Sequence, residues 1–95
     1  MSLNKNMVFV RMPEAVFRKM DEETVIVHTQ QATVTLVNES GQMIWNALDG
    51  KKTAGEIAGL MAEEYDAPEA EMEADLWAFL EELMSKNLVA VHPNR

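Results

Sequence analysis

The amino-acid sequence predicts an α+β fold of the winged helix-turn-helix type, in which a three-stranded antiparallel meander precedes three helices and a short C-terminal strand. Three observations indicate this fold: short β-prone runs fill the first part of the chain, apolar residues recur at helical spacing through the second, and an aliphatic run comes near the end. The 95 residues suffice for one domain. Folding of a domain this small buries about 60–65% of the surface that the unfolded chain exposes. We therefore expect a small core and no deep active-site cavity.

The predicted strands are the runs 15–20, 24–28 and 32–37, which short polar segments separate. The third run divides into an apolar set on one face and a more polar set on the other: Ala32, Val34 and Leu36 against Thr33, Thr35 and Val37. We expect the apolar set to meet the core. A meander also leaves the third strand at a sheet edge, where its backbone N–H and C=O groups are unpaired.

The first two predicted helices each begin at a capping residue. Asn38 is a favourable N-cap, and Gly50 suits the left-handed conformation that follows a helix. Thr53 and Glu56 have the spacing of a capping box, in which each side chain binds the backbone N–H of the other residue. Apolar spacing continues this second helix to about Tyr65.

The third predicted helix is the longest. Asp66 and Glu69 repeat the capping-box spacing with Pro68 in the turn, and apolar residues continue at helical spacing to about Lys86. Residues 88–91 then form either a terminal strand or an extended tail. The predicted domain organisation is a poorly ordered N-terminal segment 1–14, a folded domain 15–91 and a C-terminal tail 92–95.

The composition argues against several classes of partner. The formal net charge is −8, and the segment 53–85 contains ten acidic residues and no Lys or Arg. Binding to phosphates depends on Lys and Arg, so neither nucleic acid nor an anionic membrane is an expected partner. The absence of cysteine excludes disulfides and thiol chemistry and suits a cytoplasmic location. No apolar run approaches the roughly 18 residues of a membrane span, and the N-terminus lacks the layout of a signal peptide.

The sequence contains no pattern typical of catalysis or metal binding. His28 and His92 have no second histidine or clustered aspartate at the spacing of metal ligands. No Ser, Thr or Lys has a partner that would mark it as an activated nucleophile. The acidic residues between Glu69 and Asp75 occupy alternate positions, which point in nearly opposite directions on a helix, so a solvated face is expected. We therefore predict no enzyme activity and no cofactor.

Trp45, Trp77 and the eight methionines each allow two interpretations. The tryptophans lie off the main apolar stripes of their helices, so they either broaden the buried face or extend an apolar surface toward a partner. The methionines fit core packing or an adaptable binding surface.

The segment from Leu36 to Val89 carries a combination of motifs: Asn-Glu-Ser-Gly, an Ile-Trp pair, Leu-Asp-Gly, Thr-x-x-Glu-Ile and a long acidic helix before a Leu-Val strand. The residues that fill these motifs are Asn38, Glu39, Ser40, Gly41, Ile44, Trp45, Leu48, Asp49, Gly50, Thr53, Glu56, Ile57, Tyr65 and Asp75. The combination resembles the PqqD-like family, named after protein D of pyrroloquinoline quinone synthesis, over about residues 15–91.

The resemblance implies a non-catalytic peptide-binding adaptor. Proteins of this family bind the leader of a ribosomally synthesised precursor peptide and present it to a modifying enzyme, often a radical S-adenosylmethionine protein. In the family, the leader adds as a strand beside the third strand and packs next to the third helix. Carried over to this chain, the resemblance implicates eight residues in peptide binding: Thr33, Val34, Thr35, Leu36, Met72, Asp75, Leu76 and Phe79.

Two alternatives stay open at this point. The alternative function is a winged-helix transcription regulator, or a protein-interaction module of that fold without DNA binding, and a basic patch would favour the regulator. The acidic character of 53–85 favours the adaptor instead. A free strand edge can also pair with a second copy, so a homodimer is an alternative to a monomer.

Overall fold

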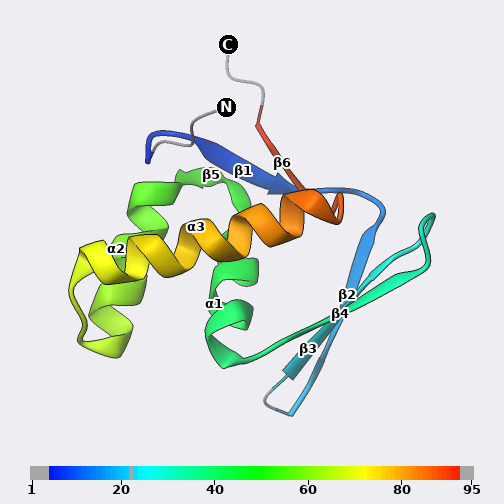
Figure 1. Cartoon of the computed structure of the whole chain (residues 1–95), viewed down its shortest axis with the longest axis horizontal. Helices are drawn as coiled ribbons and strands as arrows, with labels where there is room; N and C mark the ends of the chain where they lie inside the picture. The colour runs from blue at the N-terminus through cyan, green and yellow to red at the C-terminus, as the bar shows by residue number, and fades with distance from the viewer. Residues whose placement is uncertain (1–4, 22, 93–95) are drawn as a thin grey trace.

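The computed structural model describes residues 5–21 and 23–92, which form two small antiparallel sheets and three helices (Figure 1). The elements in chain order are β1 (Val8–Arg11), β2 (Ala15–Met20), β3 (Glu23–His28), β4 (Thr33–Val37), α1 (Glu39–Ala47), β5 (Asp49–Thr53), α2 (Ala54–Tyr65), α3 (Glu69–Ser85) and β6 (Val89–Val91). One sheet has the strand order β2-β3-β4 and the other β5-β1-β6. The predicted α+β fold is thus confirmed.

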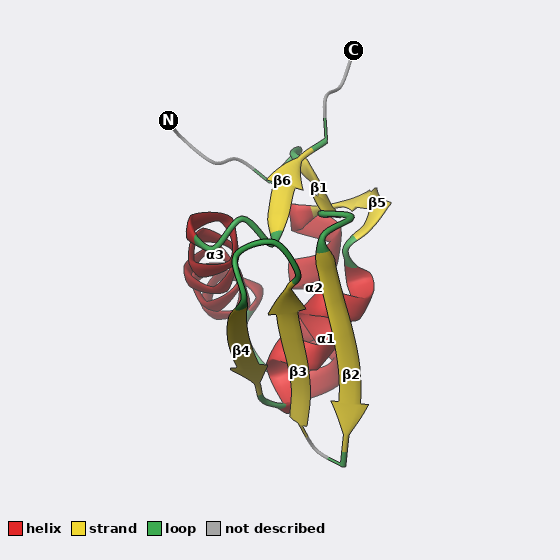
Figure 2. Ribbon diagram, turned by 90° about the vertical axis from the view of Figure 1, so that its right-hand side faces the viewer, coloured by secondary structure: helices red, strands yellow, loops and turns green. Residues whose placement is uncertain are grey.

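The meander β2-β3-β4 confirms the three strands that the sequence predicts. Its central strand pairs on both sides, so that Val27 lies opposite Val16 of β2 and opposite Val34 of β4. Figure 2 shows β4 as the edge strand on the side of α3. Nothing else in the described part of the chain pairs with that edge.

The second sheet was not fully predicted from the sequence. Its central strand β1 lies within the segment 1–14, for which poor order was expected, and it buries Phe9 to 1% exposure. Strand β5 pairs with one side of β1, and β6 pairs with the other, with Phe9 opposite Val91. The run near the C-terminus is therefore a strand, which decides between the two predicted alternatives. Residues 1–4 and 93–95 lie outside the described residues.

Two predicted helix caps are confirmed. The Asn38 side chain accepts a hydrogen bond from the Gly41 N–H at 3.0 Å and so caps α1. At the start of α2, the Glu56 N–H donates to Thr53 Oγ1 at 3.1 Å, and the Thr53 N–H donates to Glu56 Oε1 at 2.8 Å. These bonds satisfy N–H groups that have no partner within the helix. The starts of α1 and α2 are therefore fixed by their own local sequence.

The capping box predicted at Asp66 and Glu69 is wrong. Asp66 instead ends α2 in the left-handed conformation, with φ 50°, which aspartate tolerates better than most residues. Pro68 occupies the N-cap of α3, and no side chain bonds to the first turn. The proposed left-handed conformation of Gly50 is confirmed at φ 78°, but this glycine lies within β5.

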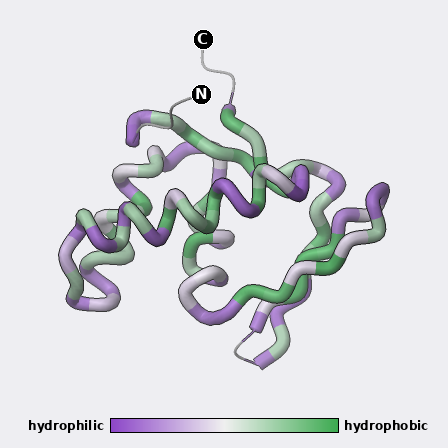
Figure 3. The backbone as a smooth tube through the Cα atoms, viewed as in Figure 1, coloured by the Kyte–Doolittle hydropathy of each residue, from purple (hydrophilic) through white to green (hydrophobic). Residues whose placement is uncertain are grey.

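The core lies between the helices and the inner faces of the two sheets. Leu76, Leu80 and Leu83 of α3 are fully buried, and so is Trp45 of α1, whose ring meets that of Phe17 edge-on at 5.6 Å. The core interpretation of Trp45 is thus confirmed. Figure 3 shows hydrophobic residues in the strands and hydrophilic residues recurring along the helices, as one-sided packing requires. None of the described helices combines the length and the apolar character needed to span a membrane.

Candidate functional site

Two hydrogen bonds near the β3–β4 turn show how the backbone of β3 faces its neighbours. The Ala32 N–H donates to the His28 C=O at 2.8 Å, so the backbone groups of His28 point toward β4. The Thr29 N–H donates to the Glu14 C=O at 2.9 Å, so the backbone groups of Thr29 point toward β2. Because the facing of backbone groups alternates along a strand, the even-numbered residues of β3 face β4 and the odd-numbered ones face β2.

The register of β4 then identifies its outward residues. Thr35 lies opposite Ile26, which faces β4, so Thr35 directs its backbone groups into the sheet. Val34 and Leu36 lie between such inward pairs, and their N–H and C=O groups point to the edge that no described strand covers. An extended chain lying beside β4 would meet these four backbone groups.

The side chains of β4 face opposite to the expectation from sequence. Val34 and Leu36 are each 63% exposed, whereas Thr35 and Val37 are each 5% exposed. The close packing of Val37 against α1 explains this: a Cβ on Gly41 would come within 2.9 Å of the Val37 Cβ. Once Val37 faces the core, the period of two along a strand places Thr35 and Thr33 beside it. The apolar set predicted to meet the core is therefore on the outer face.

A groove of about 410 Å³ lies between α1, α2 and α3, next to the point where β4 ends. Ile44, Met61, Met72 and Phe79 give it an apolar floor, and Asp75 is among its polar residues. The full lining is Asn38, Ser40, Gly41, Ile44, Met61, Tyr65, Met72, Asp75, Ala78, Phe79 and Glu82. The volume lies within the roughly 300–1,000 Å³ typical of ligand sites.

Two residues at the start of α1 shape the mouth of this groove. Gly41 lets the helix approach β4 and α3 closely, because an added Cβ would also come within 3.3 Å of the Phe79 ring. Asn38 lines the groove and holds the first turn of α1, accepting hydrogen bonds from the Gly41 N–H and the Ser40 hydroxyl at 3.0 Å each. The Asn-Glu-Ser-Gly motif therefore builds the junction between strand and groove.

The structure brings together most of the residues that the sequence singled out. Met72, Asp75 and Phe79 line the groove, and the four β4 residues lie on the strand that leads to it. Leu76 is fully buried in the core and does not line the groove. Sequence reasoning did not single out the contributions of α1 and α2 to the lining, although the capped start of α1 was itself a signal.

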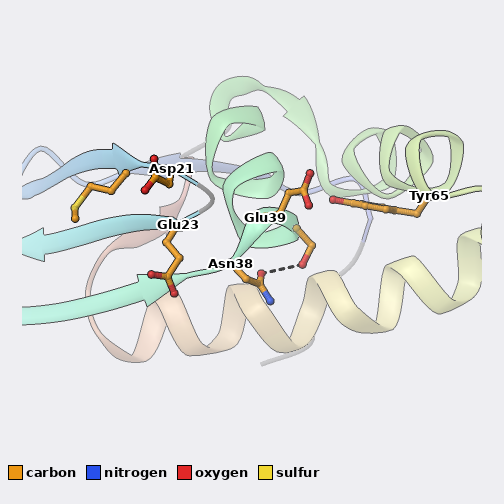
Figure 4. A pocket seen from close by; sticks show the side chains of 7 residues that line it. Asp21, Glu23, Asn38, Glu39 and Tyr65 are labelled. Atoms are coloured by element: carbon orange, nitrogen blue, oxygen red, sulfur yellow. Dashed lines mark hydrogen bonds between the residues drawn. The ribbon is translucent and has the colours of Figure 1, made fainter.

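A second, open hollow of about 1,100 Å³ adjoins the groove and is lined by Met20, Asp21, Glu23, Asn38, Glu39, Ser40 and Tyr65. Figure 4 shows the Glu39 and Tyr65 side chains pointing toward one another. Burial raises the pKa of the Tyr65 hydroxyl, and the carboxylates of Glu39 and Glu64 raise it further. Three of the seven residues that line the hollow are carboxylates and none is Lys, Arg or His, so the hollow is acidic.

His28 and Asp49 both make local hydrogen bonds to neighbouring residues of the chain. His28 is buried, and its Nδ1 accepts hydrogen bonds from the N–H groups of Gln30 and Gln31, so it stabilises the β3–β4 turn. The pKa of Asp49 is held far below its usual range by the Lys52 side chain and then by backbone N–H groups, which is a turn-stabilising arrangement. Within residues 5–21 and 23–92, no three His, Cys, Asp or Glu side chains gather closely enough to hold a metal ion.

Two solved structures have the same fold. One is "TbiB1 in Complex with the TbiA(beta) Leader Peptide", with a TM-score of 0.80 and 28% identity over 90% of this chain and 99% of that one. The other is "Lasso peptide synthetase B1 complexed with the leader peptide", with a TM-score of 0.78 and 18% identity over 86% and 96% of the two chains. No curated protein sequence matches the chain.

The family match covers β3 and β4 of the meander, β5 and the three helices that form the groove, and it begins after β1 and β2. Residues 23–89 match the family described as Coenzyme PQQ synthesis protein D (PqqD). The matched residues run from β3 into β6 and include every residue that lines the groove. The chain belongs to the PqqD family.

Proposed function

We propose that this chain is a non-catalytic adaptor that binds the leader of a ribosomally synthesised precursor peptide and presents it to a modifying enzyme. The observation that carries the proposal is the uncovered edge of β4 beside an apolar groove. An extended peptide can pair with the outward backbone groups of Val34 and Leu36 while some of its side chains enter the groove. The two similar solved structures named above are complexes with a leader peptide.

The energetics require both parts of the site. A backbone hydrogen bond contributes a net 0.5–1.5 kcal/mol, on the order of what ordering one peptide residue costs. Pairing with β4 alone therefore leaves little surplus affinity, whereas each apolar side chain buried in the groove adds about 1.5–3 kcal/mol. Association also costs translational and rotational freedom, so the apolar anchors in the groove have to supply most of the net affinity.

The proposal extends to the context in which the adaptor works. We infer a radical S-adenosylmethionine enzyme as the partner, as in pyrroloquinoline quinone synthesis, and a cytoplasmic location where ribosomal peptides are released. Raising the local concentration of substrate at that enzyme requires no catalytic group in the adaptor. The winged helix-turn-helix assignment is part of the same proposal, supported by α2 and α3 meeting at the short turn 66–68. The ten acids of 53–85 argue against DNA binding.

A display selection tests peptide binding without knowledge of the natural leader. Random 14-residue peptides displayed on yeast are sorted for binding to the fluorescently labelled full chain. The enriched peptides are then tested against an Ala78→Trp variant, because Ala78 is exposed on α3 and its enlargement fills the groove. Ala74→Trp is the matched control, since Ala74 is also exposed on α3 but does not line the groove.

We expect enriched peptides that bind the parent chain and the Ala74→Trp variant equally well and lose at least about tenfold in affinity with Ala78→Trp, or roughly 1.4 kcal/mol. Both variants should unfold near the parental temperature, because both positions are exposed. A selection that enriches no peptide, or only peptides indifferent to Ala78→Trp, would contradict the proposed function.

A further inference from the structure

The groove adjoins the acidic hollow. Asn38, Ser40 and Tyr65 line both spaces, so a peptide held in the groove lies next to the hollow. The two spaces together are lined by five carboxylates and by no Lys, Arg or His: Asp21, Glu23, Glu39, Asp75 and Glu82.

Within residues 5–21 and 23–92, four of these five carboxylates take part in no ion pair. Glu82 is paired with Lys86 at 3.1 Å, and the other ion pairs among the described residues are Lys5–Glu73 and Lys52–Asp49. Asp21, Glu23, Glu39 and Asp75 take part in none of them. Glu39 also raises the pKa of Tyr65, in addition to the effect of burial. The negative charge at this end of the groove is thus uncompensated within the described residues.

The spacing of the carboxylates indicates what kind of cation fits. The described acids do not gather closely enough to hold a metal ion. The hollow has a volume of about 1,100 Å³ and is open to solvent, which suits a long, flexible cationic side chain better than a bare ion. Lys and Arg can extend an ammonium or guanidinium group several ångströms from a backbone that is held elsewhere, and both form charge-assisted hydrogen bonds with carboxylates.

We propose that the acidic hollow selects peptides that carry a Lys or Arg next to the apolar residues that enter the groove, with Glu23 and Glu39 as the specificity-determining residues. Glu23 lies at the start of β3 and Glu39 at the start of α1, so the two approach the hollow from different elements. Selectivity of this kind affects the association rate and the discrimination between peptides more than the total affinity. The inference rests on the proposed function, because it presupposes a peptide in the groove.

The yeast-displayed library supplies the probe. The most enriched groove-dependent peptide is synthesised with an acetylated N-terminus, which removes the terminal amine as a competing cation. A second version replaces each Lys or Arg with Gln. Both peptides are titrated by fluorescence anisotropy against the parent chain, the Glu23→Gln/Glu39→Gln variant and a Glu63→Gln/Glu81→Gln variant. The last pair carries the same change in charge, and neither of its residues lines the groove or the hollow.

At low salt, we expect the parent chain and the Glu63→Gln/Glu81→Gln control to bind the basic peptide about tenfold more tightly than its Gln version, as two partly exposed charge pairs allow. The Glu23→Gln/Glu39→Gln variant should show less than about a twofold difference, and 0.5 M NaCl should reduce the preference of the parent chain by screening. Thermal unfolding of all three proteins checks that they are folded.

Different results would refute charge selection at the hollow and peptide binding in the groove. Groove-dependent peptides that carry no Lys or Arg, or a basic preference that the Glu63→Gln/Glu81→Gln control loses equally, would overturn charge selection at the hollow and leave peptide binding in place. A selection without any groove-dependent peptide would overturn both.

Discussion

Proline at the edge strand distinguishes an outward from an inward backbone position. Val34→Pro removes an N–H that points to the uncovered edge of β4, and Thr35→Pro removes one that points to Ile26 within the sheet. A proline ring also occupies the space beside the missing N–H, where an added strand would lie. The two substitutions therefore probe peptide pairing and sheet pairing separately.

Val34→Pro should mainly change the peptide affinity, and Thr35→Pro should mainly change the free energy of unfolding. Val34→Pro breaks no bond within the sheet and should change the free energy of unfolding by less than about 1 kcal/mol. It should weaken peptide binding at least about tenfold, or roughly 1.4 kcal/mol, through one lost hydrogen bond and the steric effect of the ring. Thr35→Pro leaves the carbonyl of Ile26, a residue with 0% exposure, without its partner. That loss should cost about 3 kcal/mol or more and lower Tm by roughly 12–24 °C.

The assay combines thermal unfolding with calorimetric titration of the selected groove-dependent peptide. Val34→Ala is the matched control, because it shortens the exposed side chain and keeps the N–H, and it should bind nearly as the parent does. A folded Val34→Pro variant with parental affinity would refute strand addition at this edge. Equal destabilisation by Val34→Pro and Thr35→Pro would instead show that the inward and outward assignment of β4 is incorrect.

Three further predictions concern how the site is built. Gly41→Ala should lower the free energy of unfolding by about 1–3 kcal/mol and weaken peptide binding, because its Cβ would come within 2.9 Å of the Val37 Cβ. Gly59→Ala should stabilise α2 by about 0.5–1 kcal/mol, because an added Cβ there meets nothing within 4 Å. Urea unfolding measures both changes. Thr53→Ala removes the capping side chain and should lower Tm by roughly 4–8 °C, about 1 kcal/mol, and Thr53→Ser should restore it. Glu39→Gln should lower the pKa of Tyr65 toward its ordinary value without reaching it, because burial is the larger cause of the raised pKa. Tyr65 is the single tyrosine of the chain, so tyrosinate absorbance follows its titration. An unchanged pKa in that variant would show that Glu39 does not contribute to the potential of the hollow.

The elements with strong local signals were predictable from the sequence. The β-branched runs of the meander and the caps at Asn38 and Thr53 depend on residues that are neighbours in the chain, and the structure has all of them. Strands β1 and β5 escaped prediction because their pairing is non-local. β5, with the sequence Asp-Gly-Lys-Lys-Thr, has little β-propensity, and its pairing with β1 makes it a strand.

The site was predictable only in part. The uncovered edge of β4 follows from the meander order, but the face of β4 that meets the core does not. That face is set by the contact between Val37 and the start of α1, and the alternation of hydrophobicity in the run indicates the opposite choice. The groove and the hollow combine residues from several elements that are distant in sequence, so only folding brings Asn38 beside Tyr65 and Asp75. The resemblance to PqqD-like proteins supplied the positions on α3 that local patterns could not.

Amide hydrogen exchange measured by NMR, with and without the selected peptide, tests the central proposal that a peptide adds as a strand to β4. In the free protein, the Val34 and Leu36 amides should exchange rapidly, because they face the uncovered edge, and the Thr35 amide should be protected within the sheet. Saturating peptide should protect Val34 and Leu36 at least about tenfold and leave the protection of Thr35 largely unchanged. Unchanged exchange at both Val34 and Leu36 in a saturated complex would contradict strand addition and place the peptide elsewhere on the protein.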